Sequence, residues 1–506
     1  MNRKTKLALN SGTALMHQVI SLVCGFILPR IMLVYFGSEV NGLVSSISQF
    51  LGLISLCELG VGAVVQSALY KPLAHKDQEG ISKIVISSER FFRKIALILL
   101  GYTVLLMVGY PLIVRNDFDY FYTFILIFVI SISTFAQYYF GMTYRLLLAA
   151  DQLACIYYIV QSVVLILNTI GCVVLIQLGA SIQVVKLTTS LIFLLQPMVF
   201  AVVAKRRYKI DRTLKLTEEP IKQKWNGMAQ HLASVVLENT DTVVLTVLST
   251  LENVSIYSVY HLVVYGVKRI IVSITNGTQA LFGNMLAKGE MEQLEKTFDT
   301  MEWVYHTLVT LAFSVTAMTI LPFVTVYTQS VTDLNYMVPG FAYLITLAQA
   351  TYCLRLPYNM MVLAAGHYKQ TQASAIIEAA LNVVVSVALV AWLGLIGVAI
   401  GTAVAMLYRT CYLANYLSKN ILNRKLKYFS KNLLIDVLCV VLLVVIVKSF
   451  SGFYIFATVS YTAWIVLALK VGITALLVEL VVNGIFNRQK VGVAIQLLKG
   501  KLKKNG

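Results

Sequence analysis

The chain has 506 residues, of which 58% are hydrophobic and only 13% are charged. About a quarter of the residues of a soluble protein are charged, so this composition excludes a soluble globular chain. A formal net charge of +18 would suggest nucleic-acid binding in a soluble protein. Here the basic residues lie mostly in connections and tails, which is typical of membrane topology, so we expect no nucleic-acid partner.

Apolar runs of about 20 residues recur from end to end, and this length crosses a bilayer core as a helix. Backbone groups in lipid must bond within their own segment, so each run is predicted to be helical. The sequence therefore predicts an all-α integral membrane protein with about 14 transmembrane helices. The basic N-terminus, Met1 to Lys6, precedes no convincing cleavage site, and we expect the first run to be retained.

Six predicted spans fill the first half of the chain and end near Phe36, Tyr70, Val114, Arg145, Leu178 and Ala204. Gly37 to Gly42 is predicted to be the turn between the first two spans, and Arg115 to Asp117 a short outer turn. Residues 1–204 form the predicted N-lobe. The basic segment 205–224, which contains Pro220, is the predicted linker that follows it.

Six more predicted spans lie in residues 225–417, the predicted C-lobe, which also contains an amphipathic charged loop from Lys288 to Glu302. We expect this loop to be cytoplasmic surface, and the alternative is a partner-binding helix. Two further spans lie in residues 418–486, beyond a basic loop at Lys419 to Lys431. Residues 487–506 form a basic tail. Alternate connections carry almost all of the Lys and Arg, so the excess of positive charge places both termini in the cytoplasm.

A short motif occurs twice: Leu147 to Asp151 is matched, 215 residues later, by Val362 to Gly366. An apolar helix that carries an Asn, Asn168 or Asn382, follows each copy. A repeat at one spacing indicates two homologous halves, which in membrane proteins is typical of a transporter with a central site. Six helices in each half give the halves the same orientation, about an axis along the membrane normal.

The sequence contains no motif typical of metal binding or of ATP hydrolysis. The seven Cys lie within apolar spans without metal-ligand spacing, and the six His are scattered, so we expect no metal site. A phosphate-cradling Gly-Lys-Ser or Gly-Lys-Thr loop is also missing, so ATP hydrolysis by this chain is not expected. We therefore expect a protein that is not an enzyme and has no cofactor.

Several motifs together resemble the MOP (multidrug/oligosaccharidyl-lipid/polysaccharide) exporter superfamily, and within it the polysaccharide-transporter or Wzx-type flippase branch. They are Pro29-Arg30, the stretch Phe36 to Gly42, the stretch Cys57 to Gly62 and the two Leu-Ala-Ala turns. The resemblance implies a MATE-like fold, with two six-helix lobes around a central cavity and two extra C-terminal helices.

The same resemblance implies a function. A flippase of this branch moves an undecaprenyl-pyrophosphate-linked oligosaccharide across the bacterial cytoplasmic membrane by alternating access, for surface polysaccharide biosynthesis. The partners that it implies are the lipid-linked oligosaccharide, membrane lipids, a polysaccharide polymerase and glycosyltransferases.

Charged residues within spans are informative because a charge in hydrocarbon costs several kcal/mol unless it has a partner or water. Arg and Lys suit a pyrophosphate, and aromatic groups suit sugar rings. The predicted substrate-binding residues are Arg30, His261, Tyr265, Lys268, Arg269 and Arg355. The alternative for Arg30 and Arg355 is that they extend to an interface or pair with a carboxylate.

The intramembrane acids suggest ion coupling. Glu58, Glu238, Asp241 or Glu378 would carry H⁺ or Na⁺, because burial makes a carboxylate a plausible proton carrier. Glu238 and Asp241, three residues apart, are expected on one helix face. The alternative is a structural pair with a nearby Lys or Arg, and Lys470 and Glu479, outside the repeat, are expected to form a helix pair or to pack on the lipid side.

Two other functions remain open on the sequence. A cation-coupled multidrug exporter of the same fold handles cationic substrates and would favour acids in its cavity, whereas a pyrophosphate favours Arg and Lys. A membrane-embedded polysaccharide polymerase or ligase would carry a sizeable loop for sugar-phosphate chemistry, but the loops here are short.

Overall fold

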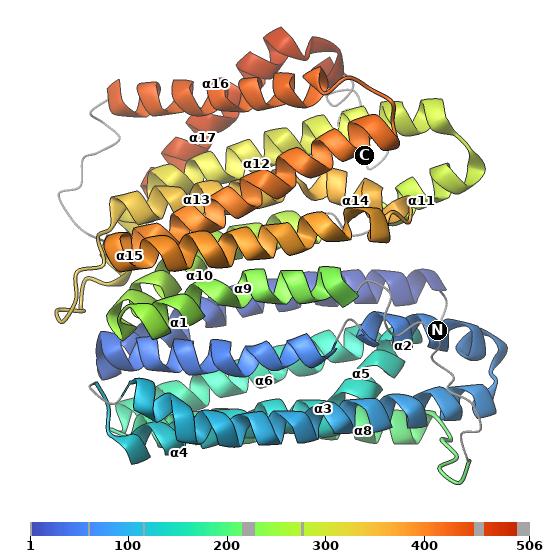
Figure 1. Ribbon diagram of the computed structural model, residues 1–506, viewed down its shortest axis with the longest axis vertical. Coiled ribbons are helices and arrows are strands. Elements are labelled where there is room, and N and C mark those ends of the chain that lie inside the picture. The colour runs from blue at the N-terminus through green and yellow to red at the C-terminus, as the bar shows by residue number, and fades with distance from the viewer. Residues whose placement is uncertain are drawn as a thin grey trace. The chain divides into compact units, whose positions relative to one another are not determined.

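The structure is a computed structural model that describes residues 3–58, 61–114, 117–214, 228–274, 278–449 and 460–492. Predicted features at Leu59-Gly60, Arg115-Asn116, 215–227 and 493–506 lie outside the described residues. Helices make up most of the described chain and none of the described residues forms a strand (Figure 1), which confirms the predicted all-α integral membrane fold.

The helical elements of the described chain follow one another from the N-terminus to the C-terminus. They are α1 (Arg3–Gly52), η1 (Leu53–Glu58), α2 (Val61–His75), α3 (Gln78–Ile113), α4 (Tyr120–Ala136), η2 (Gln137–Gly141), α5 (Met142–Ala150), α6 (Ala154–Gln177), α7 (Ile182–Phe193), α8 (Leu195–Arg207), α9 (Met228–Leu248), α10 (Leu251–Ile274), α11 (Thr278–Lys288), α12 (Met291–Tyr327), α13 (Pro339–Leu354), α14 (Leu356–Ala364), α15 (Tyr368–Asn420), α16 (Lys427–Ser449) and α17 (Tyr461–Phe486).

Nine helical stretches of the described chain are long and apolar enough to cross a membrane. Two of them, Gly12–Glu58 and Tyr368–Asn420, each join two predicted spans across a glycine. Large apolar side chains cover the outward faces: Trp392 is 85% exposed and Leu434 71%. Such faces are stable against lipid rather than water, so the chain is a multi-pass membrane protein.

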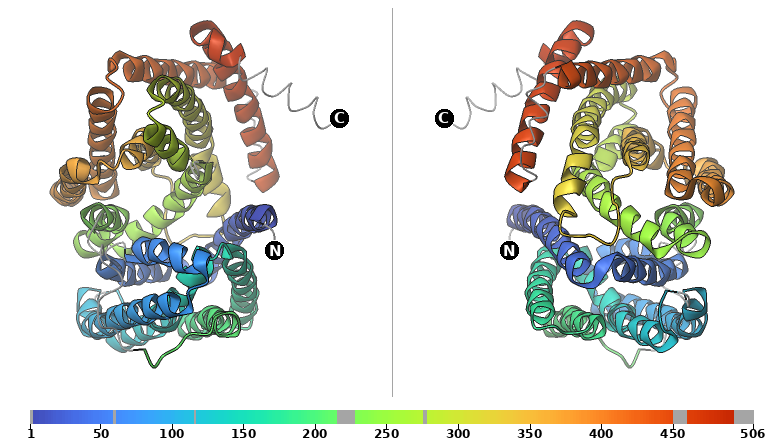
Figure 2. Two further views of the ribbon diagram at one scale, coloured as in Figure 1. Left: turned by 90° about the vertical axis from the view of Figure 1, so that its right-hand side faces the viewer. Right: turned by 90° about the vertical axis from the view of Figure 1, so that its left-hand side faces the viewer.

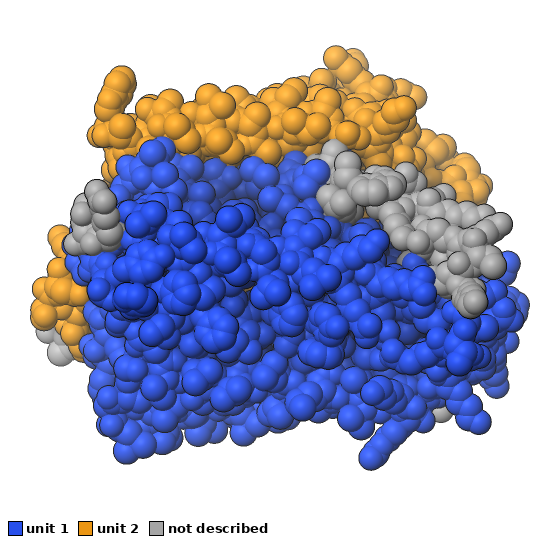
Figure 3. Space-filling model, turned by 60° about the horizontal axis from the view of Figure 1, so that its bottom comes forward, with its two compact units in different colours: residues 1–255 blue, residues 256–506 orange. Residues whose placement is uncertain are grey.

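The chain divides into two compact units, Met1–Ser255 and Ile256–Gly506 (Figure 3). In unit 1, α1 packs against α6 and α9, and α4 packs against α3 and α7. Helix α9 lies in the range that the sequence assigns to the C-lobe, yet its Thr246 hydroxyl is 2.7 Å from that of Ser46 on α1. The predicted division into lobes at 205–224 stays a prediction.

In unit 2, α12 is the helix against which the last two helices pack, as Figure 2 shows for α16 and α17. Leu443, Val447, Leu467, Val471 and Ala475 form a buried cluster there, with side chains of α12 at its edge. Helix α13 packs against α12 and α15. The two helices outside the repeat are therefore joined to unit 2 by apolar packing.

Helix α15 is a hairpin of two helices that reverses at Gly394, whose φ of 52° and ψ of −126° break the helix. A Cβ placed on Gly397 would lie 2.6 Å from the backbone carbonyl carbon of Leu389. The amide of Asn382 donates to the Thr402 hydroxyl over 3.0 Å, although 20 residues separate them. In a straight helix these two residues would be about 30 Å apart, so the two arms lie side by side.

The expected turn at Gly37 to Gly42 is a kink within α1. Gly37 alone leaves the helical region, with φ 83° and ψ 174°, and the following residues are helical again. The polar side chains of this stretch are satisfied inside unit 1, because Asn41 is buried and donates to the Ser255 hydroxyl over 2.8 Å. A longer polar turn is therefore not needed.

Both copies of the repeated motif end a nine-residue helix, α5 or α14. Leu153 N bonds Leu148 O and Gln152 N bonds Ala149 O; His367 N bonds Val362 O and Gly366 N bonds Leu363 O. Each is a Schellman cap, with a left-handed residue at Gln152 or Gly366. The two left-handed residues, Gln152 and Gly366, are 214 positions apart, one fewer than the 215 of the sequence repeat. The repeat aligns Gly366 with Asp151, but Gln152 is the residue that adopts the left-handed conformation.

The stretch from Lys288 to Glu302, predicted to be an amphipathic charged loop with a helix as the alternative, is helical beyond its first residues. Helix α11 ends at Lys288, Gly289 takes a positive φ, and α12 begins at Met291. Glu292 and Lys296, four residues apart, form an ion pair of 2.6 Å on its exposed side, while Leu294 and Phe298 are buried. This stretch is thus an amphipathic helix.

We predict that Gly397→Ala destabilises the protein by about 1–3 kcal/mol, because the added methyl group would overlap the backbone of Leu389. The measurement is the melting temperature of purified protein in one detergent. Gly472→Ala is the control, since a Cβ there meets nothing within 4 Å. Equal melting temperatures for the two variants would contradict the close hairpin.

Candidate functional site

A column of rings runs along one face of α10. Tyr257, His261 and Tyr265 are four residues apart, which places them one above the other on a helix. Their ring centroids are 5.3 Å apart for the first pair and 4.9 Å for the second, and both pairs are stacked. The Arg269 guanidinium continues the column, 4.7 Å from the centre of the Tyr265 ring.

Tyr352 of α13 brings two of the predicted cations together. The Lys268 ammonium lies 3.8 Å from the centre of its ring, and the Arg355 guanidinium carbon lies 4.2 Å from it. Both cations are buried, at 6% and 9% exposure. Cation–π contact contributes about 0.5–2 kcal/mol to each and holds the charges near one another.

Arg355 stands at a break in the helix. It ends α13 and precedes α14, where Pro357 lacks the N–H that would bond back to Cys353. Its guanidinium pairs with the buried carboxylate of Glu378 on α15. The alternative considered for Arg355, a partner carboxylate, is therefore the observed arrangement.

Glu378 serves a second cation, because Arg409 of the same hairpin lies 3.9 Å from its other oxygen. Among the described residues, Arg409 Nη1 has no hydrogen-bond partner. Four cations are thus gathered here: Arg355 and Arg409 lie beside Glu378, whereas buried Lys268 and exposed Arg269 lie against the rings of Tyr352 and Tyr265. Positive charge inside a span favours an anion beside it.

The other predicted residues lie in unit 1. Arg30 is half-buried on α1, directly after Pro29. Glu58 ends the 3-10 turn η1 rather than standing in the middle of a helix, as expected from the sequence, and it is electrostatically coupled to Arg145 and His231. The roles of both residues stay predictions.

Glu238 and Asp241 of α9 do not share an environment. Asp241 is buried, at 3% exposure, whereas Glu238 is exposed. Two positions that are three residues apart on a helix differ by about 60° around its axis. Here that angle separates a packed position from an open one. The two acids thus occupy neighbouring positions on α9, but only Asp241 is packed inside the unit.

Tyr352 and Arg409 are site residues that the sequence analysis missed. Tyr352 lies three residues before Arg355, so helical spacing alone places the two on one face. Arg409 lies inside an apolar run, where a charge is costly and so informative. Its partner Glu378 is 31 residues away, a pairing that depends on the α15 hairpin.

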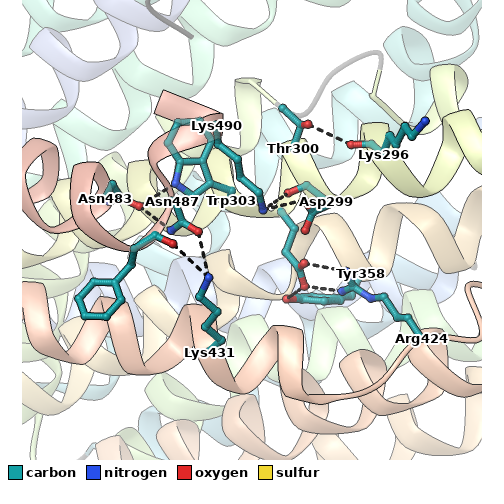
Figure 4. A network of polar contacts seen from close by, with 12 residues as sticks. Lys296, Asp299, Thr300, Trp303, Tyr358, Arg424, Lys431, Asn483, Asn487 and Lys490 are labelled. Atoms are coloured by element: carbon teal, nitrogen blue, oxygen red, sulfur yellow. Dashed lines mark hydrogen bonds and ion pairs between the residues drawn. The ribbon is translucent and has the colours of Figure 1, made fainter. Parts of the chain in front are cut away.

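A second buried polar network, also missed, joins α12 to the end of the chain (Figure 4). Arg424 binds both oxygens of Glu302, at 2.9 and 2.5 Å, and the Tyr358 hydroxyl donates to the same carboxylate over 2.5 Å. His306, four residues along α12, lies 3.2 Å from the Tyr358 hydroxyl and 2.5 Å from Asp436. The signal available in the sequence was the spacing of Glu302 and His306, two polar residues four positions apart on one helix face.

The network continues through α17. Trp303 Nε1 donates to Asn483 Oδ1 over 2.7 Å, and the Asn483 amide donates to Glu479 over 2.8 Å. Burial alone would lower the pKa of Arg424, which lies between two spans, but the hydrogen bonds and charge of Glu302 raise it. The network therefore joins α12 to α17 through Trp303 and Asn483, and to α16 through His306 and Asp436.

No protein-family profile and no curated protein matches the sequence, but solved structures do match the fold. The chain is similar to the lipid II flippase MurJ in an inward closed conformation, with a TM-score of 0.70 and 15% identity over 96% of this chain and 100% of that one.

It is also similar to an inward-facing multidrug resistance MATE family transporter of the MOP superfamily, with a TM-score of 0.58 and 15% identity over 79% of this chain and 95% of the other. A third similar structure is the Vibrio cholerae MATE transporter VcmN, with a TM-score of 0.57 and 13% identity over 84% of this chain and 100% of that one. The likeness to these structures is one of fold.

We predict that Glu378→Gln destabilises the protein by about 3 kcal/mol, because Arg355 and Arg409 would lose the carboxylate that they share in a buried site. The readout is the melting temperature in detergent. Glu238→Gln is a matched control at an exposed acid on another helix and should stay within about 0.5 kcal/mol. An unchanged melting temperature for Glu378→Gln would show that the cations do not depend on it.

We predict strong coupling between Glu302 and Arg424. Glu302→Gln alone should cost about 3–5 kcal/mol, and addition of Arg424→Met should recover part of that loss, because an unpaired buried charge is then removed. Lys296→Met, in an exposed pair, is the control and should cost less than about 1 kcal/mol. Additive effects in the double variant would contradict a buried ion pair.

Proposed function

We propose that this protein is a flippase that moves an undecaprenyl-pyrophosphate-linked oligosaccharide across the bacterial cytoplasmic membrane. The observation that carries the proposal is the cluster of Lys268, Arg269, Arg355 and Arg409 in unit 2, in which Arg355 and Arg409 share the carboxylate of Glu378. A diphosphate brings negative charge into the membrane, and buried Arg and Lys lower the cost of its crossing.

The substrate's parts fit different features of the cluster. Arg269 and Lys268 would bind phosphate oxygens, while Arg355 and Arg409 add positive potential from behind Glu378. The Tyr257, His261 and Tyr265 rings provide flat faces and polar edges that suit sugars. The polyprenyl tail would remain in the hydrocarbon, so that only the polar head has to cross.

Access to this site would alternate between the two membrane faces, as the fold of transporters similar to this chain suggests. The asymmetry of Lys and Arg supports cytoplasmic termini and loading of substrate from the cytoplasmic side. Glycosyltransferases would supply the substrate and a polysaccharide polymerase would consume it. We propose Arg30 as a further cation along the path of the substrate head group.

The driving force would be a cation, H⁺ or Na⁺. We keep Glu58, Glu238 and Asp241 as candidate carriers of that ion. Glu378 has a positioning role in this scheme, because Arg355 and Arg409 already occupy its two oxygens. A carboxylate held between two cations is a poor site for a third cation.

A cation-coupled multidrug exporter is the second candidate, and the likeness to MATE transporters favours it. Such an exporter handles cationic compounds, which the surplus of positive charge in the cluster would repel. The charge of the site therefore favours the lipid-linked anion over the cationic drug.

We predict that Lys268→Ala and Arg269→Ala each reduce translocation at least about tenfold, because a hydrogen bond to a charged group contributes roughly 1.5–3 kcal/mol. The assay uses proteoliposomes that contain the full-length protein and a fluorescent lipid-pyrophosphate oligosaccharide, with a cationic dye in a parallel arm. Lys448→Ala, an exposed cation at the end of α16, is the control.

Two outcomes would count against the proposal. If both variants flip the labelled lipid at the rate of the unaltered protein, the cluster is not its binding site. If the dye moves and the lipid does not, the multidrug exporter is the better assignment. Melting temperatures of all variants exclude unfolding as the cause.

A further inference from the structure

A cavity of about 360 Å³ lies within unit 1, and none of its lining residues belongs to the cation cluster. Glu89 and Arg93 of α3 line one side of it, Tyr139 and Tyr144 another, and Lys205 of α8 and the following Arg212 close it. Its volume falls within the roughly 300–1,000 Å³ of small-ligand sites. The function proposed above makes no use of it.

Three of the lining residues are cations and one is an acid. Glu89 binds Arg212 over 2.8 Å, and Arg93 lies 3.7 Å from its other oxygen. Lys205 is exposed and forms no ion pair with any described residue. One carboxylate therefore faces three positive charges, and the cavity keeps a net charge of about +2.

Hydrogen bonds fix the orientation of the charged walls. The Tyr144 hydroxyl donates to Glu89 over 2.9 Å and accepts from Arg212 over 2.8 Å. The Arg93 guanidinium lies over the Tyr139 ring, 5.2 Å from its centre. Arg212 is held by Glu89, so Arg93 and Lys205 are the cations with hydrogen-bond donors left for a ligand.

The segment that carries Arg212 is anchored to unit 1 by its own contacts. The Tyr208 hydroxyl is 2.7 Å from Asp151, and Asp211 N donates to the Ser82 hydroxyl over 3.1 Å. Burial, together with the bond to Asp151, raises the pKa of Tyr208. The cavity is therefore a built feature of the unit rather than a chance gap beside a loop.

The surroundings resemble the border between lipid and water. Helix α8 ends in Lys205, Arg206 and Arg207, as expected for a helix that leaves the membrane on the basic side. Next to Tyr139, the Phe140 ring is 54% exposed on an apolar span. A ligand here would meet positive charge at one end and hydrocarbon at the other.

We propose that this cavity binds the phosphate of an anionic glycerophospholipid, with the headgroup between Arg93 and Lys205 and the acyl chains beside Phe140. Basic pockets between membrane helices on the positively charged side recognise such headgroups. The guanidinium of Arg93 offers a planar fork of donors to phosphate oxygens, and Lys205 adds a point charge. Glu89 excludes a second anion by its charge and keeps Arg212 in place.

The test measures lipid retention by native mass spectrometry of the full-length protein, delipidated and then exposed to phosphatidylglycerol. Arg93→Gln and Lys205→Gln should each lower retention about fivefold, the effect of one basic residue near a membrane surface. Glu89→Gln should raise it. Arg90→Gln is the matched control, because Arg90 is exposed on the same helix and does not line the cavity.

Two further arms identify the ligand. Zwitterionic phosphatidylethanolamine should be retained less than phosphatidylglycerol, and glycerol phosphate, which has no acyl chain, should compete poorly. Equal competition by glycerol phosphate would overturn the assignment to a lipid. Retention of phosphatidylglycerol that is unchanged in Arg93→Gln, Lys205→Gln and Glu89→Gln, with melting temperatures preserved, would overturn the site.

Discussion

A charge inside a membrane needs a partner, and this constraint arranges the interior of unit 2. Arg355 would not be stable at the break between α13 and α14 without Glu378, which the α15 hairpin carries to it. Glu302 is fully buried on α12 because Arg424 and Tyr358 complete its hydrogen bonds. In both places a pair of opposite charges joins helices that are distant in the sequence.

Several kinds of contact hold the cations of the cluster. Glu378 lies between Arg355 and Arg409, and the rings of Tyr352 and Tyr265 lie against Lys268 and Arg269. Each cation–π contact stabilises a charge by about 0.5–2 kcal/mol. The cluster therefore gathers positive charge from α10, α13 and α15 within one unit.

The two basic sites differ in how they hold their charge. In unit 2 the cations are mostly buried and stacked on rings, which suits an anion that is out of contact with bulk water. In unit 1 the cations of the cavity are partly exposed, with side-chain exposures of 44% for Arg93 and 51% for Arg212. Salt screens the second arrangement far more than the first. The first arrangement suits the head group that we propose to be transported, and the second suits the lipid that we propose at the surface of the membrane.

Much of the architecture follows from the sequence alone. Apolar length determines the helical membrane fold, since backbone groups in lipid can bond only within a helix. The repeated Leu-Ala-Ala turns predict equivalent helix ends, and the rarity of intramembrane charge singles out Lys268, Arg269, Arg355 and Glu378. Only the tertiary structure decides which charges meet, because Arg409 reaches Glu378 through the reversal at Gly394 and Arg424 reaches Glu302 across 122 residues. Composition and periodicity describe one segment at a time, whereas an ion pair depends on the packing of several.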